Sequence, residues 1–153
     1  NRIVHILICE GLSRACKKTC YLHLHLSPDS HCDQGYLLYG DFCYHFEAEE
    51  VKPWDDAEQY CVQQGGHLAS VHTPEQLIPT GVSLWMGGHD STTEGGWEWT
   101  DGSPYRYINW NAGESAECVE MVTTANGTSW WNDLNCDAHQ DWICMIAKGQ
   151  TAL

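Results

Sequence analysis

Trp131-Asn132-Asp133, followed by Cys136 and by Trp142-Ile143-Cys144, is the stretch of sequence that decides the fold. It places a side-chain amide next to a carboxylate on a tryptophan-anchored segment that two nearby cysteines could hold in place. Ca²⁺ is coordinated by about six to eight oxygen ligands, so adjacent amide and carboxylate oxygens on a rigid segment suit this ion. An isolated Asn-Asp pair is more often a solvated turn, and the rest of the sequence has to decide between the two interpretations.

The chain has 153 residues, nine cysteines and a formal net charge of −14. This length fits one domain with a single core. Nine cysteines favour an oxidising, extracellular compartment, for a secreted protein or the ectodomain of a membrane receptor. Because the count is odd, at least one thiol is free, bonded to another chain or paired with a missing segment.

The charge is distributed unevenly along the chain. Residues 1–31 carry four cationic and two acidic side chains, whereas residues 32–153 carry three cationic and nineteen acidic ones. Such an acidic domain repels phosphate backbones and keeps no basic patch to bind one, which excludes a nucleic-acid partner. The acidity suits cation binding, although an acidic solvated surface explains it equally well.

The chain is expected to have three parts: an N-terminal appendage (1–31), one folded domain (32–148) and a short tail (149–153). The apolar run Ile3–Ile8 is too short to span a bilayer. It is the remnant of a signal or anchor segment, or a misread extension. The chain starts at Asn1, so we expect the sequence to be a fragment.

Strand signals dominate the folded part. Tyr36–Phe46 is aromatic and alternating around Gly40-Asp41, which predicts a β-hairpin. Further short strands are expected at 68–71, 84–86, 118–121, 129–131 and 142–145.

Helix signals are fewer. Pro53 is suited to the first turn of a helix that ends at Gly65-Gly66, and Thr73-Pro74 starts a second, short helix. Residues 89–118 are polar and Gly-rich, which predicts a long loop region of a kind that is usually functional.

Together these residues resemble a C-type lectin-like domain in its long form, from Cys32 to about Lys148. The run Gly95–Pro104 is most similar to domains of the mannose receptor and phospholipase A2 receptor group. Fish lectins and type II antifreeze proteins share the scaffold. The motifs that carry the resemblance are Cys32–Tyr36, Cys43-Tyr44, Cys61, Gly66–Ser70, Trp85–Gly88, Trp97–Gly102, Asn109-Trp110, Glu117–Val119, Trp131–Asp133, Cys136 and Trp142–Cys144.

The resemblance implies an α+β fold with two short antiparallel sheets, one to two helices, a long loop region and three disulfides. The implied pairs are Cys32–Cys43, Cys61–Cys144 and Cys118–Cys136, which spacing alone cannot select. Cys9, Cys16 and Cys20 remain, enough for one local bridge and one interchain bond in a disulfide-linked oligomer.

The resemblance also implies a primary Ca²⁺ site formed by Glu114, Asn132 and Asp133. Here the family pattern is broken, because Gly113–Cys118 lacks the Pro-Asn pair and Ala116 stands where a further Glu belongs. Since Ca²⁺ affinity follows ligand charge and rigidity, we expect this site to be weakened by orders of magnitude or lost.

A second, structural Ca²⁺ site is implied at Asp90, Glu94 and Glu117. The alternative is that Asp90 caps a turn and Glu94 is solvated.

Other candidate sites are weaker. Cys16, Cys20, His23 and His25 have donor types suited to zinc, but such cysteines in a secreted chain are more often disulfide partners. Gly113–Glu117 departs from the nucleophile-elbow motif because Glu117 replaces its last glycine. Asn126-Gly127-Thr128 is an N-glycosylation sequon.

Two functional hypotheses follow. The first is Ca²⁺-dependent binding of glycans or glycoproteins through Glu114, Asn132 and Asp133, with sugar hydroxyls completing the ion's coordination shell. The alternative is Ca²⁺-independent recognition of a protein ligand by the loops, and ice binding is a more distant third. An enzyme is not expected, because no nucleophile, base and oxyanion pocket can be assembled from the motifs.

Overall fold

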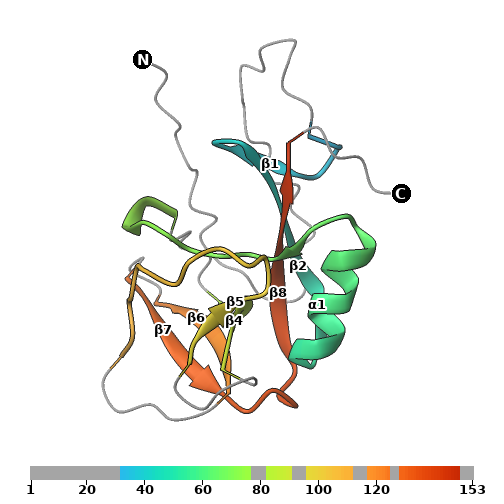
Figure 1. Cartoon of the computed structure of the whole chain (residues 1–153). Helices are drawn as coiled ribbons and strands as arrows, with labels where there is room; N and C mark the ends of the chain where they lie inside the picture. The colour runs from blue at the N-terminus through green and yellow to red at the C-terminus, as the bar shows by residue number, and fades with distance from the viewer. Residues whose placement is uncertain (1–31, 77–81, 91–95, 112–116, 125–127, 149–153) are drawn as a thin grey trace.

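The computed structural model describes residues 32–76, 82–90, 96–111, 117–124 and 128–148 (Figure 1). The residues 1–31 and 149–153, expected to be an appendage and a tail, lie outside this description. The elements in chain order are β1 (Leu37–Tyr39), β2 (Phe42–Lys52), α1 (Trp54–Gln63), β3 (His67–Leu68), the 3₁₀ turn η1 (Pro74–Gln76), β4 (Leu84–His89), β5 (Glu98–Trp99), β6 (Cys118–Thr123), β7 (Ser129–Leu134) and β8 (Gln140–Ala147).

The described strands form one sheet in the order β1-β2-β8-β4-β6-β7, with β3 added to β8 and β5 to β4. The predicted α+β class is confirmed, but its two antiparallel sheets are joined into one. The join is the parallel pairing of β4 with β8, in which Leu84 faces Asp141 and Trp85 faces Trp142. A parallel contact between strands far apart in sequence has no local signature, which is why the sequence did not indicate it.

Both faces of the central strands are buried, which explains their continuous apolar runs. On β4, Leu84 and Met86 join one core cluster, and Trp85 between them joins the other. Trp142 and Ile143 on β8 divide between the two clusters in the same way. Aromatic residues of the long loop region cover the first cluster, and α1 covers the second.

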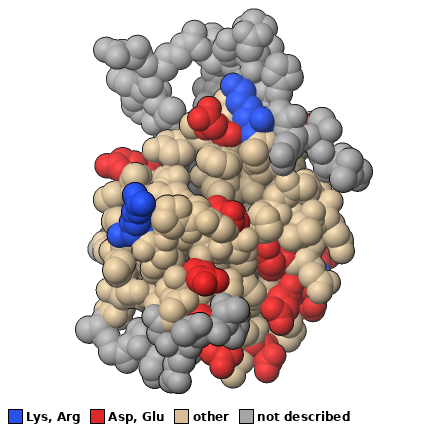
Figure 2. All heavy atoms as spheres, in the orientation of Figure 1, with Lys and Arg blue, Asp and Glu red and all other residues tan. Residues whose placement is uncertain are grey.

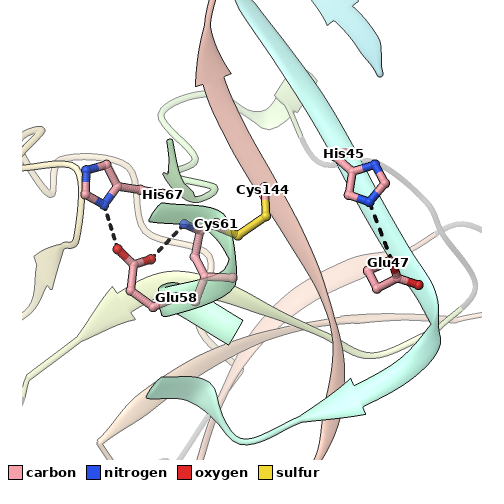
Figure 3. The surroundings of a disulfide bond; sticks show 7 residues. His45, Glu47, Glu58, Cys61, His67 and Cys144 are labelled. Atoms are coloured by element: carbon pink, nitrogen blue, oxygen red, sulfur yellow. Dashed lines mark hydrogen bonds and ion pairs between the residues drawn. A yellow bond between two sulfur atoms is a disulfide. The ribbon is translucent and has the colours of Figure 1, made fainter. Parts of the chain in front are cut away.

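The helix α1 is fixed to the sheet by polar as well as apolar contacts. Trp54, Ala57 and Cys61 form its buried face, at the spacing of one side of a helix. Figure 3 shows Glu58 on the same helix with its carboxylate directed at β3: Oε1 lies 2.6 Å from His67 Nδ1, and Oε2 accepts a 2.8 Å bond from the Leu68 N–H. This carboxylate therefore holds the middle of α1 against β3, beside the Cys61 disulfide.

Three disulfides fasten the described domain, and their pairings are those that the resemblance implies: Cys32–Cys43, Cys61–Cys144 and Cys118–Cys136. The second joins residues 83 positions apart and contributes about 4 kcal/mol on the chain-entropy model. It ties α1 to β8 in the middle of the sheet.

Two glycines in the recognised motifs are required by close backbone approach. A Cβ on Gly66 would lie 2.3 Å from the Met145 carbonyl oxygen, and one on Gly87 would lie 2.7 Å from the Leu68 oxygen. Neither backbone oxygen can move without disturbing the sheet, so these positions exclude side chains.

The remaining local predictions are largely confirmed. The β1–β2 hairpin turns at Gly40, whose φ of 59° favours glycine. α1 begins directly after Pro53 and ends before Gly65, as predicted. The helix expected from Thr73 is only the η1 turn over the described residues, where the Gln76 side chain accepts bonds from the His72 and Thr73 N–H groups.

Candidate ligand-binding site

Asn132, the first half of the amide–carboxylate pair, is bonded to a neighbouring strand. β7 pairs with β6 in an uninterrupted antiparallel register that places Asn132 opposite Glu120. The Asn132 Nδ2 donates a 2.8 Å hydrogen bond to Glu120 Oε1, and the Gln140 Nε2 donates one of 2.7 Å to Oε2. Glu120 is only 5 % exposed. Its burial raises the pKa of the carboxyl, and the Asn132 bond partly offsets that rise.

Asp133, the second half of the pair, lies on the other face of β7. It is opposite Val119 in the register, next to Trp131, and is 6 % exposed. Because successive side chains of a strand alternate between faces, Asn132 and Asp133 point apart. Glu114, the third predicted ligand of the primary Ca²⁺ site, lies outside the described residues.

The predicted structural Ca²⁺ site is brought together only in part. The Asp90 N–H donates a 3.1 Å bond to the Glu117 carbonyl oxygen, so these two residues are neighbours as the resemblance implies. Glu94 is outside the described residues. Within the described ranges, no three or more His, Cys, Asp or Glu side chains are grouped so as to hold a metal ion.

The positions of Asn132 and Asp133 can be compared with what a Ca²⁺ ion requires. The ion requires several oxygen ligands that converge on one point. Asn132 and Asp133 diverge, and the amide of Asn132 is oriented by a carboxylate that already binds two donors. Asn132 and Asp133, the two described members of the predicted set, therefore do not by themselves offer converging oxygens to a Ca²⁺ ion.

A surface cleft of about 270 Å³ lies beside the Cys118–Cys136 disulfide. It was not predicted, because its walls come from α1, the start of β6 and the turn after β7. Figure 2 shows acidic side chains gathered at the lower right of the molecule, on the side where α1 begins. The residues that line the cleft are Trp54, Asp55, Glu117, Cys118, Asn135, Cys136 and Asp137.

A second polar group includes a serine, a histidine and an aspartate. The buried Ser70 Oγ donates a 2.6 Å bond to Asp101 Oδ2, and His72 Nε2 lies 3.0 Å from the same Oγ. In a hydrolytic triad the serine proton is directed to the histidine, which the carboxylate orients. Here the serine hydroxyl donates its hydrogen bond to the Asp101 carboxylate and not to the histidine, so Ser70 is not an activated nucleophile.

Trp131 is the centre of an aromatic cluster that supports the long loop region. The rings of Trp99, Tyr105, Tyr107 and Trp110 all approach it edge-on, at centroid distances of 5.5–5.8 Å. Such packing makes these aromatics, including Trp110, part of the core.

Other residues noted in the sequence fall outside the described residues. These are Cys9, Cys16, Cys20, His23, His25, Asn126 and most of the Gly113–Glu117 motif. Within the described ranges, no helix has the length and apolar character needed to cross a membrane.

Comparison with known proteins identifies the scaffold. The profile of the "Lectin C-type domain" family matches residues 50–146. A type-2 ice-structuring protein of Brachyopsis segaliensis is 41 % identical over 126 residues, covering 76 % of this chain and 73 % of that protein. The galactose-specific lectin nattectin of Thalassophryne nattereri is 30 % identical over 128 residues, covering 75 % and 80 %. A solved calcium-independent type II antifreeze protein superposes with a TM-score of 0.71 at 33 % identity, covering 82 % of this chain and 99 % of its own.

Proposed function

This chain belongs to the C-type lectin domain family, and from this premise we propose that it is an extracellular recognition domain that binds its ligand without Ca²⁺. The ligand proposed is a protein surface, contacted by the long loop region. The finer likeness to the mannose receptor and phospholipase A2 receptor group stays a prediction.

One observation carries the proposal: Asn132 and Asp133 are directed to opposite faces of β7, and the Asn132 amide is bonded to Glu120. The sequence adds that the Pro-Asn pair is missing and that Ala116 replaces an acidic ligand. The resemblance to a calcium-independent antifreeze protein is consistent with a scaffold that is stable without the ion. Three disulfides and a buried aromatic core supply that stability here.

The domain is proposed to bind and not to catalyse. The arrangement of Ser70, His72 and Asp101 supports this, since the serine proton is directed away from the histidine. The three disulfides support an oxidising, extracellular compartment. We keep the extent of the domain at 32–148, with 1–31 as a separate appendage.

Binding arrays with and without chelator test the proposal. The purified chain would be applied to an array of extracellular proteins and to a glycan array, each in Ca²⁺ and in EDTA. The proposal expects protein binding of equal strength in both buffers. Glycan binding that EDTA abolishes would overturn the proposal and favour the hypothesis of a Ca²⁺-dependent lectin. The relative named a galactose-specific lectin is the reason for testing glycans.

Ice binding is a second candidate, favoured by the relative named an ice-structuring protein at 41 % identity. The test is an ice-recrystallisation assay in EDTA, with the reduced and alkylated chain as control. Inhibition by the native chain alone supports this candidate, and equal crystal growth in both samples removes it.

A further inference from the structure

The extended segment Ser103–Asn109 has a surface that the fold does not use. Exposure alternates strictly along it: Tyr105, Tyr107 and the two end residues are half-buried, whereas Pro104, Arg106 and Ile108 are exposed. This period of two is that of a β-strand with one face on the core. We call Pro104, Arg106 and Ile108, with the backbone between them, the outer strip.

The inner side chains fix the segment on the domain. Tyr105 lies with its ring centroid 4.8 Å from Trp99, and Tyr107 lies 5.5 Å from Trp131. At its end the Asn109 carbonyl accepts a 2.8 Å bond from the Trp131 N–H of β7. The outer strip is therefore held in one conformation before any partner arrives, which lowers the entropic cost of binding.

The backbone of the outer strip is not part of a ladder. No hydrogen bond joins the main chain of Tyr105–Ile108 to any residue that the structure describes. An extended segment with unpaired N–H and C=O groups is a template for an added strand.

The exposed side chains give this template chemical character. Ile108 is 61 % exposed, the highest value among the large hydrophobic residues of the described ranges. Arg106 makes no ion pair with a described carboxylate, although residues 32–153 carry nineteen acids and only three cations. In Figure 2 the left flank of the molecule shows a basic group with an acidic group above it among uncharged residues, and in Figure 1 the gold trace of this segment runs on that side.

We propose that the outer strip is a docking site for an extended peptide that carries one acidic residue two positions from an apolar residue. Arg106 and Ile108 are two positions apart on one face, so an added strand would present its matching side chains at the same spacing. The peptide backbone would pair with Tyr105–Ile108. This inference rests on the proposed function, whose protein ligand it specifies.

The charge of the domain restricts the rest of the peptide. The Debye length is about 8 Å at physiological ionic strength, so one carboxylate in contact with Arg106 is attracted while distant acids are screened. Further acidic residues would approach the acidic remainder of the domain, and neutral or basic flanks are favoured. A second copy of the chain is disfavoured because each copy has a net charge of −14.

Selection from a phage-displayed library of random linear peptides, in EDTA, tests the proposal. Enriched peptides should share an acidic residue two positions from an apolar one. Synthetic copies should bind Arg106→Glu and Ile108→Asn at least about tenfold more weakly than the wild type. Arg106→Glu should also bind a peptide whose acidic residue is replaced by lysine more tightly than it binds the original peptide.

Lys148→Glu and Val62→Asn are matched controls, because Lys148 is another exposed cation and Val62 is another exposed apolar residue, on α1. Both should bind like the wild type. No enriched motif, or motif peptides that bind all four variants equally, would overturn the inference. A parallel selection in Ca²⁺ separates the two failures: a motif that is enriched only in Ca²⁺ would overturn the proposed function, whereas no motif in either buffer would overturn this inference alone.

Discussion

The Asn132 amide donates a 2.8 Å hydrogen bond to the buried carboxylate of Glu120, directly across the β6–β7 ladder. A side chain that the sequence assigns to a metal thus contributes to the polar interior of the sheet. With Gln140 on the other carboxylate oxygen, both acceptor atoms of Glu120 are used. The chain has the Asn-Asp pair that the resemblance assigns to a Ca²⁺ site, and its Asn132 side chain stabilises the pairing of β6 with β7.

Removal of the Glu120 carboxylate is expected to destabilise the domain. In Glu120→Ala the half-buried Asn132 and Gln140 amides lose their charged acceptor, which costs about 1–3 kcal/mol. Urea denaturation followed by tryptophan fluorescence measures the change. Glu49→Ala, on an exposed part of β2, is the control and should have little effect. Equal midpoints for the two variants would contradict the role of Glu120.

The same carboxyl is expected to make stability depend on pH. Burial raises its folded-state pKa above the ordinary value of 4.5, so the folded state favours the protonated form. Its contribution is therefore fully present below the ordinary pKa and is lost as pH rises through the raised value. The stability of the wild type relative to Glu120→Gln should fall over this rise, as measured by denaturation at a series of pH values. A flat difference would show that Glu120 does not titrate differently on folding.

The disulfides are expected to contribute differently to the free energy of unfolding, according to the length of the loop that each one closes. Replacement of Cys61 and Cys144 by alanine opens a loop of 83 residues and should cost about 4 kcal/mol, whereas the Cys32–Cys43 pair closes only 11 and should cost about 3 kcal/mol. Thermal unfolding of the two double variants gives the ranking. A larger loss for the Cys32–Cys43 pair would contradict it.

Replacement of Trp131 and of its neighbour Trp130 is expected to destabilise the domain to different extents. Trp131 is fully buried and contacted by four aromatic rings, so Trp131→Ala should cost about 3–5 kcal/mol. Trp130 is half-buried on the other face, and its replacement should cost clearly less. Near-ultraviolet circular dichroism and denaturation midpoints compare them, and equal losses would show that Trp131 is not the centre of the cluster.

Asn126 is predicted to carry an N-linked glycan when the chain passes through a eukaryotic secretory pathway. The secreted protein should lose mass on treatment with an amidase that removes such glycans. Asn126→Gln and Thr128→Ala should abolish that loss, and Thr124→Ala, outside the sequon, should keep it. A wild-type protein without this mass loss would contradict the prediction that Asn126 is glycosylated, and it would weaken the argument that the chain is secreted.

Much of the fold could be predicted because its signals are local. Pro53 and Gly65-Gly66 delimit α1, and Gly40 marks the first hairpin. The parallel pairing of β4 with β8 could not be predicted, since neither strand carries a mark of its partner.

The candidate site was harder to predict, for a geometric reason. Adjacency in sequence suggests that Asn132 and Asp133 act together, but a strand directs neighbouring side chains to opposite faces. Glu120 left a usable signal, as an acid between apolar neighbours in a strand that is buried on both faces. The acidic cleft gave none, because its residues come from three separate segments.

The central claim is that recognition by this domain does not require Ca²⁺, and calorimetric titration of the metal-free chain with Ca²⁺ tests it most directly. We expect no binding heat up to millimolar Ca²⁺, for the wild type and for Asp133→Ala alike. Saturable heat of millimolar or tighter affinity in the wild type, abolished in Asp133→Ala, would contradict it.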